Sequence, residues 1–291
     1  SPIDDLLVFH TVFGKTVPEI SLNAIANLGY ADCRFLRPVF AGDTLSAKTE
    51  VLGARENTNG ESGIVYVRSE GHNQRGELVL TFARWVMVRK RTKDAKAPPG
   101  TVPDLPKAVA PTALHVFPPE SLARAHRADC GATKFFDDYA PGQRIDHADG
   151  MTVEEAEHMM ATRLYHNTAR VHFNQHTERQ GRFGRRIVYG GHVISVARAL
   201  SYNGLESALF VAGVNAGRHV SPCFAGDTIY AWSEVLEKAN PSARSDWGFL
   251  RLRTIGLKDR GGAGFPDKQA DGSYDPAVIL DLDYWVVVPR G

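Results

Sequence analysis

An internal repeat limits the fold of this chain more than any other feature of its sequence. Residues 38–44 read PVFAGDT and residues 222–228 read PCFAGDT, a spacing of 184 residues. Further along, WVMV at residues 85–88 matches WVVV at residues 285–288 after a short insertion. Self-similarity over a long and nearly constant spacing indicates that one structural unit occurs twice. We therefore predict that the 291 residues form a tandem duplication.

Both copies have the same predicted order of elements. A buried helix is predicted at residues 21–29 (SLNAIANLG) and at residues 192–204 (HVISVARALSYNG), because apolar residues recur at helical spacing and a glycine follows. The helices come after the aromatic-glycine pairs Phe13-Gly14 and Tyr189-Gly190. The predicted fold class is α+β, with an antiparallel sheet wrapped around a buried helix in each half. Three strand-like segments are predicted in each copy, at residues 44–54, 62–71 and 78–88, and at residues 228–238, 248–258 and 277–288.

The predicted domains are an N-terminal half at residues 1–91, a linker at residues 92–133 and a C-terminal half at residues 134–291. The linker is rich in Pro and Ala, and we expect it to run along the surface. The first copy has far fewer residues before its aromatic-glycine pair than the second, so we expect it to lack its first elements. Either an N-terminal piece is missing, or the first copy is degenerate there. We favour a missing piece, because a sheet without its first strand would expose an unpaired edge.

The charge balance points away from polyanionic partners. Lys and Arg total 34 against 33 Asp and Glu, so nothing favours a nucleic acid or an anionic membrane, and we expect a small-molecule ligand. The three cysteines, Cys33, Cys130 and Cys223, are far apart and show no C-x-x-C spacing, which predicts neither a disulfide framework nor a zinc knuckle. No apolar run approaches the roughly 20 residues that span a bilayer, so we expect a cytoplasmic protein.

The stretch YHNTARVHFNQH at residues 165–176 holds three histidines, two asparagines and an arginine, but no carboxylate. His172 and His176 have the spacing of a helical zinc pair, but no acidic or cysteine ligand stands close by, so a metal site is not favoured. A polar loop with surface histidines and an acid/base site both fit the residues. The acid/base interpretation also needs a group elsewhere that stabilises an electrophile.

Gly190 and Gly191 offer such a group. They precede the second predicted helix, where backbone N–H groups lack intrahelical partners and the helix dipole is positive, so they could hold a developing oxyanion. Alternatively, the two glycines only allow close packing. We interpret the repeated FAGDT segments structurally and predict that Asp43 and Asp227 accept hydrogen bonds from backbone amides in a turn. Cys33 and Cys223 are interpreted as core filler.

The segment from FFDDYAPGQ through the second helix to FAGDT resembles the MaoC-like (R)-specific enoyl-CoA hydratases, which have a hotdog fold and often occur as fused double hotdogs. Those hydratases carry Asp-x-Asn-Pro-x-His before the helix and a His-Gly pair at its start. In this chain Asn167 stands at the Asp position and His172 at the His position, while Ala169-Arg170 replaces Asn-Pro. Tyr189 takes the place of the later His, and Gly190 is retained.

The resemblance implies reversible addition of water to a 2-enoyl-CoA, with His172 as acid/base and Asn167 orienting the water. The amino-acid sequences of both copies are most similar to the branch of this family that converts mesaconyl-CoA to β-methylmalyl-CoA. Because mesaconyl-CoA has a free carboxylate, we expect a nearby cation, with Arg170 first, then Arg186, and Tyr189 also in contact with substrate. No metal is implied, and no cofactor apart from the CoA of the substrate.

Two other functions stay open at this stage. An acyl-CoA thioesterase would need an Asp or Glu to activate water, whereas a non-catalytic acyl-CoA-binding module would need only the pocket. Since only the second copy holds the motif, we expect one active site per chain, with the first copy contributing packing and part of the acyl pocket. His166 and His176 are interpreted as bystanders. We expect a homo-oligomer, with a dimer as the first expectation, because the fold leaves sheet edges available.

Overall fold

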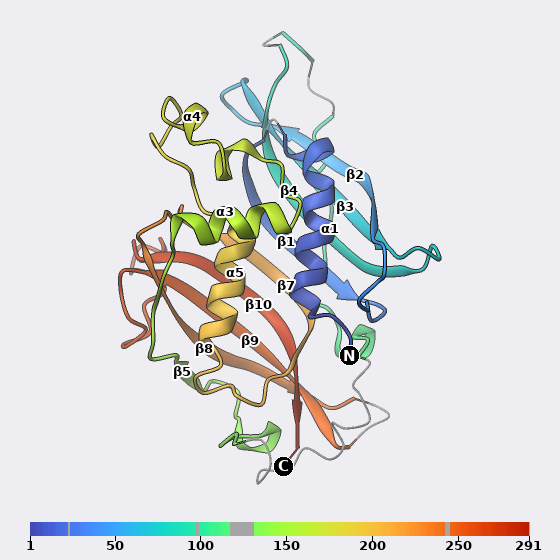
Figure 1. Cartoon of the computed structure of the whole chain (residues 1–291), viewed down its shortest axis with the longest axis vertical. Helices are drawn as coiled ribbons and strands as arrows, with labels where there is room; N and C mark the ends of the chain where they lie inside the picture. Colours follow the sequence, from blue (N-terminus) through green and yellow to red (C-terminus); the bar gives the residue numbers. More distant parts are fainter. Residues whose placement is uncertain (23, 93, 97–98, 117–130, 242–244, 291) are drawn as a thin grey trace.

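The structure is a computed structural model that describes residues 1–22, 24–92, 94–96, 99–116, 131–241 and 245–290. One ten-stranded sheet runs through the molecule in the order β2-β3-β4-β1-β7-β10-β9-β8-β5, and β6 pairs with β8. All of the pairings are antiparallel. Cys130 and residues 117–130 of the predicted linker lie outside the described residues. The predicted α+β arrangement, a sheet curved around buried helices, is confirmed (Figure 1).

The elements of the two halves follow a similar order. Those of the first half are α1 (Asp5–Ile20), β1 (Ala24–Phe35), β2 (Ser46–Glu56), β3 (Ser62–His72) and β4 (Leu78–Arg89). Those of the second half are β5 (Arg144–Asp146), β6 (Met151–Thr152), α3 (Glu155–Leu164), α4 (Gln175–Glu178), α5 (Gly190–Leu200), β7 (Phe210–His219), β8 (Thr228–Ala239), β9 (Trp247–Lys258) and β10 (Val278–Pro289). Short 3-10 turns lie at η1 (Pro111–Ala113), η3 (Phe136–Asp138) and η4 (Arg170–His172).

The prediction of the first helix was wrong. The helix α1 contains the Phe13-Gly14 pair instead of following it, and residues 24–29, which were predicted to be helical, belong to strand β1. Asp4 starts the helix early, because its carboxylate accepts hydrogen bonds from the first-turn amides of Leu6 and Leu7. The buried face of α1 includes Leu6, Phe9, Phe13 and Val17. Residues 24–35 form a strand because β4 pairs with one of its edges and β7 with the other.

The other predicted elements agree better with the structure. The second predicted helix is confirmed as α5, although it begins at Gly190 and ends at Leu200. The six predicted strands correspond to β2, β3, β4, β8, β9 and β10. The strands β1 and β7 were missed, and both lie in the middle of the sheet. Cys33 of β1 and Cys223 are buried, as expected for core filler.

The two halves share one sheet and one core. Strands β1 and β7 pair antiparallel, with Tyr30 opposite Gly217 and Cys33 opposite Val214. Helices α1 and α5 lie on the same face of this sheet (Figure 1), and Nε2 of His10 in α1 is 2.9 Å from Oγ of Ser195 in α5. A single hydrophobic cluster contains buried residues of both helices and both sets of strands. The duplicated units are therefore packed as one body.

The repeated FAGDT segments form the same turn twice. The carboxylate of Asp43 accepts a hydrogen bond from the amide of Phe40, and that of Asp227 accepts one from Phe224, each at 2.9 Å. Gly42 and Gly226 have φ values of 96° and 93°, a conformation that favours glycine. The structural interpretation of the repeat is confirmed.

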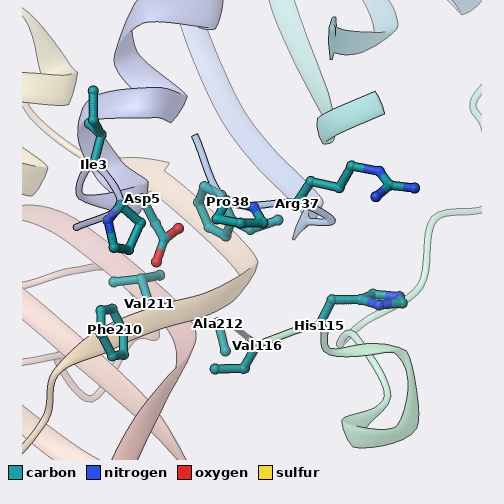
Figure 2. A pocket seen from close by; sticks show the side chains of 11 residues that line it. Ile3, Asp5, Arg37, Pro38, His115, Val116, Phe210, Val211 and Ala212 are labelled. Atoms are coloured by element: carbon teal, nitrogen blue, oxygen red, sulfur yellow. The ribbon is translucent and has the colours of Figure 1, made fainter. Parts of the chain in front are cut away.

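Part of the predicted linker packs against the joint between the halves. The Val109 carbonyl accepts a hydrogen bond from the Trp285 indole, and the Val109 amide donates to Asn215 Oδ1. Further along, His115 and Val116 approach Asp5 and the beginning of β7 around a small cavity of about 40 Å³ (Figure 2). This cavity lies at the end of β1 and the start of β7.

The two halves are in close contact at Gly14 of α1. A Cβ atom at this position would overlap the backbone carbonyl oxygen of Tyr165, at the start of the histidine-rich stretch. Alanine in a helix is normally worth about 1 kcal/mol more than glycine. We nevertheless expect Gly14→Ala to lower the free energy of unfolding by about 1–3 kcal/mol, because the stretch must move. Urea unfolding measures the change.

Gly261→Ala is the control, because no atom lies within 4 Å of a Cβ at that exposed position. We expect it to change stability by less than about 0.5 kcal/mol. A Gly14→Ala protein more stable than the parent would contradict the close contact between α1 and Tyr165.

Candidate active site

A cavity of about 420 Å³ lies where the two halves meet. The first half contributes residues of α1, the start of β1, and Met87 of β4. The second half contributes part of the histidine-rich stretch, the N-terminus of α5 and the end of β7. The cavity therefore collects Asn167, His172, Tyr189 and Gly190, four of the residues predicted from the sequence.

His172 presents one defined nitrogen to the cavity. Its Nδ1 lies 3.1 Å from the carbonyl oxygen of Ile187. A carbonyl can only accept, so in the neutral imidazole Nδ1 carries the proton and Nε2 keeps its lone pair. Burial lowers the pKa of His172 to about 4, and the Ile187 carbonyl only partly opposes this effect. His172 is therefore a neutral base at pH 7.

Asn167 is buried and held in one orientation. Its Oδ1 accepts a hydrogen bond of 2.9 Å from the Ala169 amide. This contact leaves the Nδ2 amino group as the part of the side chain available to the cavity, where it can only donate. A water that donates to Nε2 of His172 and accepts from Nδ2 of Asn167 would satisfy both groups.

The N-terminus of α5 closes another side of the cavity. The amides of Gly190 and Gly191 lie in the first turn, where no intrahelical acceptor exists. Gly190 lines the cavity, and a Cβ there would overlap the imidazole of His219. Gly191 is buried behind it, and a Cβ there would strike the Tyr189 ring. Both glycines thus allow close packing, and Gly190 also lines the cavity.

Tyr30 and His219 were missed by the sequence analysis. Tyr30 lies on β1 and His219 ends β7, and the phenol oxygen is 3.1 Å from Nε2 of the imidazole. Burial raises the pKa of Tyr30, so its hydroxyl stays protonated in this hydrogen bond. Burial lowers the pKa of His219 to about 4, which keeps it neutral. No local pattern marks these residues, because they meet only where β1 pairs with β7.

Tyr189 lines the cavity and packs in a ring of aromatic side chains. Its ring centroid lies 5.6 Å from that of His172 and 5.8 Å from that of His10. Its hydroxyl is buried and has no hydrogen-bond partner among the described residues. Burial also raises its pKa, so it remains a neutral donor.

The arginines predicted to bind a carboxylate lie elsewhere. Arg170 is exposed and Arg186 pairs with Glu155, and neither lines the cavity. Arg182 does line it, as an exposed side chain over the ring of Phe183. His166 and His176 are exposed and do not reach the cavity wall. Arg170 shares the turn η4 with His172, but of these two residues only His172 lines the cavity.

Comparison with known proteins places this site in a class. Residues 137–246 match the model of the MaoC like domain. The chain is 60% identical over 290 residues to the beta-methylmalyl-CoA dehydratase of Chloroflexus aurantiacus, covering all of this chain and 82% of that protein. It is 55% identical to the mesaconyl-CoA hydratase of Cereibacter sphaeroides, covering 83% of that protein.

Solved structures agree with this assignment. A MaoC domain protein dehydratase from Chloroflexus aurantiacus superimposes with a TM-score of 0.96 at 60% identity, over all of this chain and 83% of that one. A Mycobacterium tuberculosis protein described as a double hotdog fold has a TM-score of 0.71 at 24% identity, which supports the fold alone; the match covers all of this chain and 82% of that one. The molecule is thus a double-hotdog hydratase/dehydratase, a hydro-lyase. The chain belongs to the MaoC-like dehydratase family.

In the described ranges, no three His, Cys, Asp or Glu side chains are grouped to hold a metal ion. Nor does any helix in those ranges combine the length and hydropathy that a bilayer span requires.

Buried neutral histidines predict a loss of stability in acid. Burial lowers the pKa of His10 to about 3 and those of His172 and His219 to about 4, from 6.5. Below pH 6.5 the unfolded chain binds protons that the native state does not, so stability falls with pH until the native pKa values are reached. Asp5 opposes this with one proton, because burial raises its pKa to about 7. From these four groups we expect a loss of roughly 2 kcal/mol per pH unit between pH 6 and 5. Burial also lowers the pKa values of His147, His158 and His192, which acts in the same direction.

Denaturant unfolding at pH 7.5, 6 and 5 measures this dependence. A free energy of unfolding that stays constant from pH 7 to pH 5 would show that the three imidazoles are not held neutral.

Proposed function

We propose that the chain catalyses reversible hydration of mesaconyl-CoA to β-methylmalyl-CoA, the reaction that the names of its two relatives describe. One observation carries the proposal: a single cavity collects Nε2 of His172, the amide of Asn167 and the N-terminus of α5. Hydration of a conjugated thioester needs these three functions, namely a base, a water holder and a stabiliser of oxyanion charge.

In the proposed mechanism, a water lies between Asn167 and His172 next to C3 of the substrate. Nε2 of His172 takes a proton as the water oxygen bonds to C3, and the electron pair of the double bond moves toward the thioester oxygen. The amide of Gly190 and the positive end of α5 stabilise the negative charge there. The imidazolium, which is a strong acid because burial lowers its pKa, then returns the proton to C2. Dehydration follows the same steps in reverse.

The cavity is less suited to a thioesterase. No Asp or Glu is among its described lining residues, so a carboxylate base for direct hydrolysis is lacking. A non-catalytic binding module would have no need for a histidine held in one tautomer by Ile187. Arg182 at the edge of the cavity is the cation we assign to the CoA phosphates. A homo-oligomer and a cytoplasmic location stay predictions.

The base is tested by replacing His172. We expect His172→Gln to lower kcat for hydration about 10²- to 10⁴-fold with little change in KM, because only the proton transfer is removed. Loss of the absorbance of the conjugated thioester gives the rate. His176→Gln is the control, since His176 is exposed on α4, and it should act like the parent protein. A folded His172→Gln enzyme of near-normal rate would refute the assignment.

Asn167→Asp tests why an amide occupies this position. The Asp would keep one oxygen on the Ala169 amide and turn the other, which is charged, toward a substrate that has its own carboxylate next to C3. We expect kcat/KM for mesaconyl-CoA to fall by about 10-fold or more from charge repulsion. The neutral substrate crotonyl-CoA should be affected less. Equal losses for both substrates would show that charge is not the reason for Asn167.

A further inference from the structure

Arg84 in β4 is a buried cation without an anion. Its side chain is fully buried, at 0% exposure. Nη1 donates to Oγ of Ser21 at 2.7 Å and Nη2 donates to Oγ1 of Thr16 at 2.8 Å, while Nε has no partner. The guanidinium also lies 4.4 Å from the centre of the Phe13 ring. Among the described residues, no carboxylate forms an ion pair with it.

Such an arrangement is costly by itself. Removing an arginine from water costs several kcal/mol, which an anion usually offsets. Other arginines of the sheet have that compensation: Arg253 contacts Asp267 and Asp281, and Arg68 contacts Asp32. Burial lowers the pKa of Arg84 only to about 10, so it remains charged at pH 7.

The fold itself does not require a cation at this position, as the second half shows. In the first half Arg84 stands opposite Tyr30 on the neighbouring strand. At the corresponding register of the second half, one residue before the repeated tryptophan, Tyr284 stands opposite Val214. The Tyr284 hydroxyl is 3.0 Å from the Thr254 hydroxyl, and this neutral pair fills the same place. Packing therefore does not explain Arg84.

Arg84 lies directly behind the wall of the active-site cavity. Ser21, Phe13 and Tyr30 line that cavity, and the first two contact the guanidinium. The Ser21 oxygen accepts from Arg84, so its own proton is free to donate to an anion inside the cavity. The hydrogen bond from the guanidinium polarises the Ser21 O–H, which makes this hydroxyl a better donor to an anion.

We propose that the Ser21 hydroxyl, which Arg84 holds from behind the cavity wall, binds the free carboxylate of the acyl group, and that this pair makes the enzyme specific for acyl-CoA thioesters that carry one. This inference rests on the proposed function for the identity of the substrate. The first half then supplies the charge that selects the substrate, while the second half supplies the acid/base chemistry. A neutral acyl group would leave the buried charge uncompensated.

The test compares mesaconyl-CoA with tiglyl-CoA, in which a methyl group replaces the carboxylate. We expect Arg84→Met to lower kcat/KM for mesaconyl-CoA by about 10- to 100-fold, the usual worth of a charge-assisted hydrogen bond. The value for tiglyl-CoA should change less than about 3-fold, a small effect on this scale. Arg68→Met, which removes an arginine outside the cavity, should not separate the two substrates. Equal losses for both substrates, or no loss, would overturn the inference.

Ser21→Ala covers the case in which Arg84→Met does not fold. It removes the hydroxyl that lines the cavity and leaves Arg84 its bond to Thr16, and we expect a loss of about 5- to 10-fold that is confined to mesaconyl-CoA, as for a single hydrogen bond. A loss shared by both substrates would overturn the inference.

Binding measurements keep this inference separate from the proposed reaction. Calorimetry with the saturated thioesters methylsuccinyl-CoA and 2-methylbutyryl-CoA needs no turnover. The parent protein should bind methylsuccinyl-CoA about 10-fold more tightly or better, and Arg84→Met, or Ser21→Ala, should reduce the preference. A protein that shows this preference but hydrates nothing would refute the proposed function alone. A protein that hydrates mesaconyl-CoA without the preference would refute the role of Arg84 alone.

Discussion

The antiparallel pairing of β1 with β7 is the interaction on which the rest of the structure depends. It joins two half-sheets into one, removes an exposed edge from each, and brings α1 and α5 onto the same face. The cavity exists only because of this joint, since its walls come from α1 and β1 on one side and from α5 and β7 on the other. Small residues make the approach possible: Gly217 opposite Tyr30 leaves room for the phenol ring, and Gly190 leaves room for His219.

Burial sets the chemistry of the site. The imidazoles of His10, His172 and His219 are removed from bulk water, which lowers their pKa values and keeps them neutral. A neutral group costs less to bury than a charged one. The neutral imidazole of His172 in the second half therefore needs no counter-ion. Arg84 of the first half is a buried cation behind the cavity wall, and the exposed Arg182 of the second half lies at the cavity edge. Under the two proposals above, the halves have diverged, one toward proton transfer and one toward recognition of charge.

The repeat, the long strands and the family resemblance were predicted correctly because each has a local or a copied signal. Alternation of apolar residues indicates β8 and β9. The Asp residue of each FAGDT segment indicates a turn, because its carboxylate accepts a hydrogen bond from a nearby backbone amide. The first helix was misplaced because Phe13-Gly14 was matched with Tyr189-Gly190. The 184-residue spacing of PVFAGDT aligns Gly190 with Leu6 in the first turn of α1. Arg170 and Arg186 were predicted to bind the substrate carboxylate because they are near His172 in the sequence. The buried arginine without an ion pair, Arg84, is far from His172 in the sequence.

The sequence by itself determined the duplicated α+β architecture, and it identified His172, Asn167 and Gly190 as candidates, because periodicity, spacing and residue type are encoded locally. The tertiary structure alone decided which nitrogen of His172 faces the cavity, since that depends on the Ile187 carbonyl fifteen residues away. It also decided that Tyr30, His219 and Arg84 belong near the site. Burial and cross-strand contact arise only when distant segments pack together, so the sequence carries no local sign of them.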